Sequence, residues 1–155
     1  MDYIKHLRSM VGNEKVIMVV AGALVFNPKG LLLLQLRSDN QKWGLPGGFM
    51  ELNESVQDTA KREVFEETGL HLGEISLFGI YSGPNKEKTF PNGDQVALVE
   101  VFFKCNNYTG VLVEKNEESL QNRFFSLDEL PNNIFLEHIG VINDVLSEKK
   151  LPVVG

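Results

Sequence analysis

The sequence has few of the features that mark secreted, membrane-spanning or disulfide-linked proteins. It holds a single cysteine, Cys105, which excludes an intramolecular disulfide and suits a reducing compartment. The first residues, MDYIKHLRSM, lack the apolar core of a secretory signal. No apolar run approaches the roughly 18 residues of a transmembrane helix. We therefore expect a soluble, cytoplasmic protein.

Internal repeats, low-complexity segments and Pro/Ser-rich linkers are also missing. The 155 residues are enough to bury a substantial core, and 43% of them are hydrophobic, including ten Phe. We expect a single domain that spans residues 1–155.

Positive charge is sparse. The formal net charge is −6 and the sequence contains no block of Lys or Arg. Proteins that bind DNA or RNA through the phosphate backbone normally carry a basic stripe, so a nucleic-acid-binding surface is not expected. An acidic protein can still bind a polyanion when metal cations lie between them.

Strand compositions dominate the chain. The apolar runs 16–26 and 31–37 are separated by the turn composition Asn27-Pro28-Lys29-Gly30, which predicts a hairpin of two strands. Further strands, the last followed by a turn, are predicted at 74–83, 94–105 and 123–131.

Three segments have helical patterns. A short helix is predicted at 2–10, a central helix from Ser55 to about Thr68, and a third over 134–150 with its apolar side formed by Ile134, Ile139, Ile142, Val145 and Leu146. Several strands together with these helices predict a mixed sheet covered by helices, in an α/β or α+β layered domain.

The central helix carries acidic residues where they are unexpected. Its C-terminal turns hold Glu63, Glu66 and Glu67, although the negative end of the helix dipole favours Lys or Arg. At about 100° per residue, Glu63 and Glu67 lie on or beside the apolar stripe of the helix. A run of acidic residues usually forms a solvated face of a helix. Such a face would lie opposite the apolar stripe, which is not where Glu63 and Glu67 lie.

Partial burial makes unpaired carboxylates costly. Arg62 can pair with Glu66, and with Glu54, but one guanidinium cannot neutralise the whole cluster. A hard divalent cation such as Mg²⁺, which takes oxygen ligands and often binds substrate phosphates as well, can do so. The spacing therefore leaves a metal site and a solvated face as alternatives.

A longer motif decides between them. The segment GFMELNESVQDTAKREVFEETGL fits the Nudix box, G-x5-E-x7-R-E-U-x-E-E-x-G-U, at every specified position. The matching residues are Gly48, Glu54, Arg62, Glu63, Val64, Glu66, Glu67, Gly69 and Leu70. A match of this length at fixed spacing is highly specific, and the chain resembles a Nudix hydrolase.

The resemblance implies an α/β/α sandwich with a central mixed sheet and helices on both sides. It also implies hydrolysis, dependent on Mg²⁺ or Mn²⁺, of a nucleoside diphosphate linked to another moiety. Glu63 and Glu67 would be the main metal ligands, together with the carbonyl of Gly47, and Glu66 would be a ligand or a proton acceptor.

Other parts of the site follow from the same resemblance. Arg62 and Glu54 would form a salt bridge that orients the helix and the loop that begins at Gly48. A late loop in the family often adds an acid; here it offers Glu117 and Glu118, of which Glu118 is favoured as a ligand or general base. The base is therefore Glu66 or Glu118.

Residues outside the box are weaker candidates. Arg37 could contact a substrate phosphate or simply lie at the surface, and Phe90 could stack on a base. Asp94 could face the cleft, although Asn92-Gly93 explains this stretch as a turn. His6, His71 and His138 share no metal-ligand spacing, so none of the three is expected to have a functional role, and Trp43 is expected to pack in the core.

A noncatalytic nucleotide-sensing module is the alternative function, although such a module would be expected to lose box acids. The substrate could be ADP-ribose, a nucleotide sugar, an oxidised nucleoside triphosphate, a dinucleoside polyphosphate or a capped RNA end. The terminal helices could support a homodimer.

Overall fold

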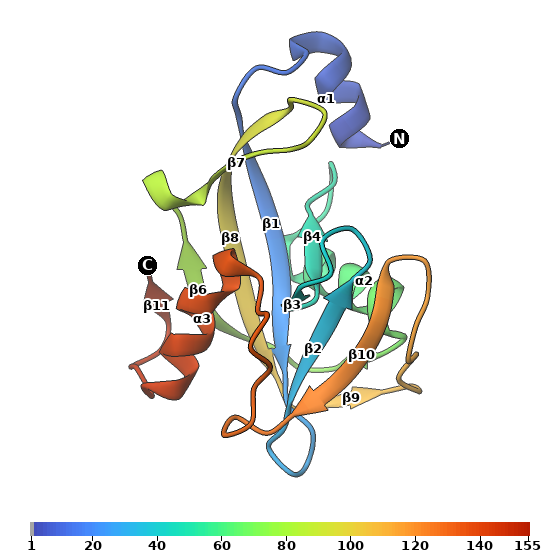
Figure 1. The fold of residues 1–155 in the computed structure, drawn as a ribbon, viewed down its shortest axis with the longest axis vertical. Coiled ribbons are helices and arrows are strands. Elements are labelled where there is room, and N and C mark those ends of the chain that lie inside the picture. The colour runs from blue at the N-terminus through green and yellow to red at the C-terminus, as the bar shows by residue number, and fades with distance from the viewer. Residues whose placement is uncertain (1) are drawn as a thin grey trace.

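The computed structural model describes residues 2–155 (Figure 1). Along the chain the elements are α1 (Tyr3–Val11), β1 (Val16–Val25), β2 (Leu32–Arg37), β3 (Trp43–Gly44), β4 (Gly47–Phe49), α2 (Val56–Thr68), β5 (His71–Leu72), β6 (Ser76–Tyr81), the 3₁₀ turn η1 (Pro84–Lys86), β7 (Glu87–Thr89), β8 (Gln95–Cys105), β9 (Tyr108–Thr109), β10 (Ser119–Phe125), α3 (Leu136–Leu146) and β11 (Val153–Val154).

The main sheet has the strand order β11-β6-β8-β1-β4, and β7 pairs with the beginning of β8. Strands β1 and β8 run parallel along the whole of β1. By contrast, β4 pairs antiparallel with β1, and β6 pairs antiparallel with β8. The sheet is therefore mixed, as predicted.

The predicted hairpin of β1 and β2 is found only at its turn, where the Asn27 amide donates to the Leu31 carbonyl at 3.0 Å, although both strands exist. They meet at a single bridge, Phe26 with Leu32, and then diverge. Both edges of β1 are already paired, one with β8 and the other with β4. Consequently β2 leaves the main sheet and joins a second one, in the order β10-β2-β3.

Helix α2 covers one face of the main sheet. Ala60 on the helix is buried against Ala21 of β1 and Val101 of β8. One turn later Val64 packs with Ala23. Small alanines on the central strand let the helix approach closely and bury its apolar stripe, which is the main driving force for this packing.

Helix α3 covers the opposite face (Figure 1). There Val141 and Ile142 pack with Leu24 and Phe102. Helices thus lie on both sides of a central mixed sheet, which confirms the predicted fold class. At one end of β1, α1 places Ile4 and Leu7 against Met18. Within residues 2–155, no helix is both long and apolar enough to span a membrane.

The buried side of α3 differs from the predicted one. Ile139 is 38% exposed, whereas His138 is buried with Val141 and Ile142. The cause is the entry to the helix, because the Phe135 amide donates a hydrogen bond to the Trp43 carbonyl and so fixes where the helix starts. The expected core packing of Trp43 is confirmed, with its ring edge-on to Phe125.

Candidate active site

The site is built on α2, whose ends are where the sequence predicts them. The Ser55 side chain accepts a hydrogen bond from the Asp58 amide at 3.0 Å and caps the N-terminus. At the other end Gly69 adopts a left-handed conformation with φ 80°, which glycine adopts without steric cost. The helix between them therefore has a fixed register.

Arg62 ties α2 to the segment before it. Its Nε and Nη2 donate to the two oxygens of Glu54 at 2.6 and 3.0 Å, and Nη2 also donates to the Phe49 carbonyl at 3.0 Å. The hydrogen bonds from Arg62 are the main reason that the pKa of Glu54 is lowered to about 2. This arrangement is the salt bridge that the family resemblance implies for these two residues.

Glu63 lies against the backbone of Gly48. A Cβ atom built on Gly48 would be only 2.6 Å from Oε1 of Glu63, so a side chain at position 48 and the carboxylate cannot coexist in this arrangement. Arg62 donates to the same oxygen at 2.9 Å. Burial is the largest effect on Glu63 and raises its pKa, although Arg62 opposes it.

Glu67 is the most deeply buried acid of the helix, at 2% exposure. The Gly47 amide donates to its Oε1 at 2.8 Å, and Nη1 of Arg37 lies 3.6 Å from its Oε2. Burial raises the pKa of Glu67 to about 8, with a smaller contribution from the charge of Glu63. Arg37 and Gly47 only partly offset the cost of an ionised carboxylate here.

The C-terminus of α2 is capped by side chains from the segment that leads into β10. The Glu67 carbonyl accepts hydrogen bonds from Asn122 at 2.8 Å, from Asn116 at 3.0 Å and from Ser119 at 3.1 Å. These donors satisfy a helix carbonyl that has no partner within the helix. Sequence reasoning missed them; the available signal was the absence of a basic residue in the last turn of α2.

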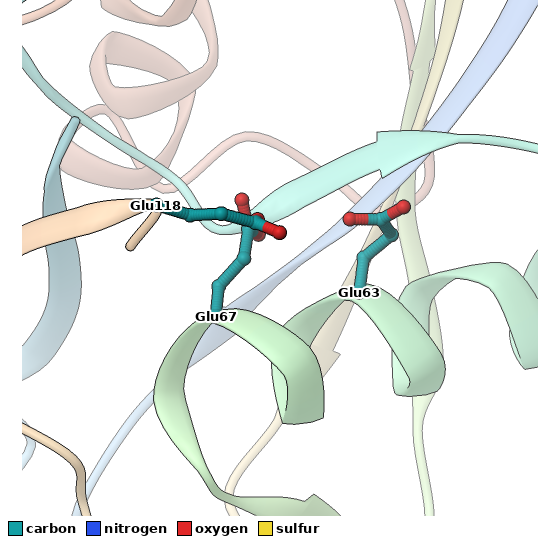
Figure 2. A group of neighbouring side chains, drawn as sticks. All are labelled: Glu63, Glu67 and Glu118. Atoms are coloured by element: carbon teal, nitrogen blue, oxygen red, sulfur yellow. The ribbon is translucent and has the colours of Figure 1, made fainter. Parts of the chain in front are cut away.

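The same segment brings Glu118 to the helix. Carboxylate oxygens of Glu63, Glu67 and Glu118 lie within 4.8 Å of one another. Figure 2 shows Glu63 and Glu67 rising from successive turns of α2, with Glu118 reaching toward them from the start of β10. Three converging carboxylates, one of them buried with a raised pKa, fit a divalent cation that binds through oxygen.

Glu66 lies apart from this cluster. Its carboxylate is 46% exposed and is 3.4 Å from Nη1 of Arg62. Of the four predicted acids, the structure thus brings together three and directs the fourth toward solvent, while it still lines the same cleft.

The cleft beside the carboxylates has a volume of about 360 Å³. Arg37 and Phe90 line it, as do Gly47 and Gly48. Asp94 does not line it and instead lies 3.5 Å from Nε of Arg8, an ion pair that ties the loop before β8 to α1.

A model of the NUDIX domain matches residues 16–145 of the chain. The chain belongs to the Nudix hydrolase family. It is 29% identical to an ADP-ribose pyrophosphatase from Methanocaldococcus jannaschii over 133 residues, which cover 84% of this chain and 74% of the relative.

The chain is also similar to a second curated protein and to a solved structure. Nucleoside diphosphate-linked moiety X motif 6 from Xenopus laevis is 38% identical over 113 residues, covering 72% of this chain but only 50% of the relative. The MutT protein from Methanosarcina mazei shares the fold, with a TM-score of 0.69 at 24% identity over 88% of this chain and 99% of the other.

The cleft of this Nudix protein also holds residues that sequence reasoning missed. Lys88, Glu100, Phe135 and His138 line it together with Phe90. His138 was expected to have no functional role because the three histidines share no metal-ligand spacing. Its place in the cleft depends on the rotation of α3, which the local sequence pattern does not reveal.

Proposed function

We propose that this Nudix pyrophosphohydrolase cleaves the diphosphate linkage of a nucleoside diphosphate joined to another moiety, with Mg²⁺ or Mn²⁺ as its cofactor. The observation that carries the proposal is the convergence of Glu63, Glu67 and Glu118 beside a cleft that also presents Arg37. An acidic site of this kind binds an acidic substrate through cations, which is consistent with the net charge of −6.

Glu63, Glu67, Glu118 and the Gly47 carbonyl would hold the cation. When bound, a divalent cation neutralises charge on the diphosphate and makes water more acidic. The Gly47 amide, 2.8 Å from Glu67, keeps the buried carboxylate facing the cleft. Arg37 has planar donors suited to a phosphate: its Nε and Nη2 donate to Asp39 at 3.1 Å, and its Nη1 lies 3.6 Å from Glu67 at the cleft.

In the hydrolysis, a water oxygen forms a bond to one phosphorus atom, the bond from that phosphorus to the bridging oxygen breaks, and a carboxylate takes the proton of the water. Glu118 is the favoured proton acceptor because it is exposed at the cleft and lies with Glu63 and Glu67. Glu66 is the second candidate; it lines the same cleft, but its carboxylate lies 3.4 Å from Nη1 of Arg62 and outside the cluster of three acids.

The relative from Methanocaldococcus jannaschii makes ADP-ribose the first substrate to test. The panel should also include nucleotide sugars, oxidised nucleoside triphosphates, dinucleoside polyphosphates and capped RNA, each with and without Mg²⁺ or Mn²⁺. Phosphate or nucleotide release identifies the substrate. Tight binding without any hydrolysis across this panel would favour the noncatalytic nucleotide-sensing module instead.

Replacing Glu67 with Gln tests the role of the buried acid. The amide keeps the shape of the side chain but loses the charge, so turnover should fall by orders of magnitude while the far-ultraviolet circular dichroism is unchanged. Glu74→Gln, an exposed acid outside the cleft, should retain wild-type turnover. Wild-type turnover in Glu67→Gln would contradict the proposal.

The proton acceptor is tested by comparing Glu118→Gln with Glu66→Gln. The neighbour Glu117 is exposed and lies outside the carboxylate cluster, so Glu117→Gln is a matched control. The variant that lacks the true base should no longer show the fall in rate on the acidic side of the pH–rate profile. If Glu66→Gln alone does so, Glu118 is not the base.

A further inference from the structure

Glu118 differs from the other two acids of the carboxylate cluster because no helix holds it. Glu63 and Glu67 lie one turn apart on α2, whereas Glu118 lies in the segment before β10 and is exposed. Fixing an exposed residue of an irregular segment at a ligand costs conformational freedom unless its backbone is already held. The place of Glu118 in the cluster therefore depends on the contacts of its backbone.

The carbonyl side of Glu118 is held by β2 and α2. The Glu118 carbonyl accepts hydrogen bonds from the amide of Ser38 at 3.1 Å and from its hydroxyl at 3.2 Å. The next residue, Ser119, is completely buried; its hydroxyl accepts from Nε2 of Gln35 at 2.8 Å and donates to the Glu67 carbonyl at 3.1 Å. None of these contacts holds the amide of Glu118.

Asn116 holds that amide, and it uses both ends of its side chain. Its Oδ1 accepts hydrogen bonds from the amides of Glu118 and Ser119, both at 2.9 Å, which closes a turn around Glu118. Its Nδ2 donates to the Glu67 carbonyl at 3.0 Å. One side chain therefore links the backbone of one acid of the cluster to the backbone of another.

Asn122 donates to the same carbonyl but lacks this link. Its Nδ2 lies 2.8 Å from the Glu67 carbonyl and 2.8 Å from the Val113 carbonyl. Both contacts satisfy carbonyls, and neither involves the turn at Glu118. The two asparagines thus share the capping of α2, whereas the contact with Glu118 belongs to Asn116.

We propose that Asn116 is a positioning residue for the metal site, which fixes the Glu118 carboxylate beside Glu67 and so strengthens the binding of the cation. It acts through Glu118 and is not itself a ligand. Because the turn is already closed by Asn116, binding of the cation does not have to order this segment. The proposal rests on the proposed function, in which Glu118 helps to hold the cation.

The affinity of the substrate-free protein for Mn²⁺ tests the proposal without any measurement of turnover. Electron paramagnetic resonance measures free Mn²⁺ during a titration. Asn116→Ala should weaken Mn²⁺ binding about ten-fold, the lower end of the range for residues that orient metal ligands. Glu118→Gln should weaken it at least as much, because it removes the carboxylate itself.

The wild type distinguishes failure of this proposal from failure of the proposed function. Mn²⁺ binding by the wild type with the same affinity in Asn116→Ala would overturn the positioning role alone. No Mn²⁺ binding by the wild type would overturn the positioning role and the metal-dependent function together.

The double variant Asn116→Ala/Glu118→Gln separates positioning from a general structural role. If Asn116 acts through Glu118, its loss has no further effect once the Glu118 carboxylate is gone. The double variant should then bind Mn²⁺ as tightly as Glu118→Gln alone. Losses that multiply in the double variant would show that Asn116 acts by another route, and would overturn the proposal.

Asn122→Ala is the matched control, because it removes a donor to the same Glu67 carbonyl and leaves the turn at Asn116 intact. It should keep the Mn²⁺ affinity of the wild type although it weakens the cap of α2. Thermal melting of the metal-free variants shows that each is folded. An equal loss of Mn²⁺ affinity in Asn122→Ala and Asn116→Ala would assign the effect to the helix cap and overturn the positioning role.

Discussion

The carboxylate of Glu63 occupies the space in which a side chain on Gly48 would begin. This contact explains why a glycine at position 48 accompanies a glutamate fifteen positions later in the box. The backbone of β4 approaches α2 closely enough that only a residue without a side chain fits between them. The position of Glu63 is therefore set by position 48 as well as by its own helix.

Gly48→Ala should displace the Glu63 carboxylate. Positioning residues around metal sites typically contribute about 10–100-fold in metal affinity or activity, so the concentration of Mg²⁺ or Mn²⁺ needed for half-maximal turnover should rise within that range. Measuring the hydrolysis rate at increasing concentrations of Mg²⁺ or Mn²⁺ gives this half-maximal concentration.

Gly140→Ala is the matched control for this change. Gly140 lies in α3, and a Cβ atom there would contact nothing within 4 Å. Since alanine favours helices over glycine by about 1 kcal/mol, this variant should be as stable as the wild type or more so, with the same metal requirement. An unchanged metal requirement in Gly48→Ala would show that Glu63 does not bind the metal.

Asn122→Ala should destabilise the protein by about 1–3 kcal/mol, because it removes a buried donor. The Asn122 amide donates to the carbonyls of Glu67 and Val113, both at 2.8 Å, and the alanine leaves the two carbonyls without this donor. Urea unfolding measures the loss. Asn132→Ala, at an exposed asparagine, should change stability by less than about 0.5 kcal/mol.

The boundaries of α2 could be predicted because their signals are local. Ser55 and Gly69 act on their own helix ends, and the burial of Glu67 follows from its place beside the apolar stripe. Such features depend on residues a few positions apart, which the sequence shows directly.

The remaining features depend on distant contacts. The pairing of β1 with β8 joins Val16 to Val96, and the cap of α2 joins Glu67 to Asn122. No pattern within either segment specifies the other. For the same reason the sequence did not reveal that His138 lines the cleft, because its direction is set by the helix entry at Phe135 rather than by the apolar pattern of α3.

Arg62→Lys should lower stability by about 1–3 kcal/mol although the charge is kept. Arg62 uses all three of its nitrogens to bind Glu54, Glu63 and the Phe49 carbonyl, and a single ammonium group cannot replace this planar set of donors. Urea unfolding at neutral pH provides the measurement. Arg123→Lys makes the same exchange at an exposed position and should be close to neutral; equal losses in both variants would mean that the network contributes nothing specific.

His138 should make stability depend on pH. Burial first, and then the charges of Lys86, Arg37 and Lys88, lower the pKa of His138 to about 3, from 6.5 in an unfolded chain. The unfolded chain therefore takes up a proton that the folded protein does not, so this contribution is complete above pH 6.5 and is lost as the pH falls toward 3. Between pH 7 and pH 5 the wild type should lose about 2 kcal/mol more unfolding free energy than His138→Gln, which cannot titrate. Urea unfolding of both proteins at the two pH values measures the difference, and parallel losses would show that the folded protein accepts the proton at His138.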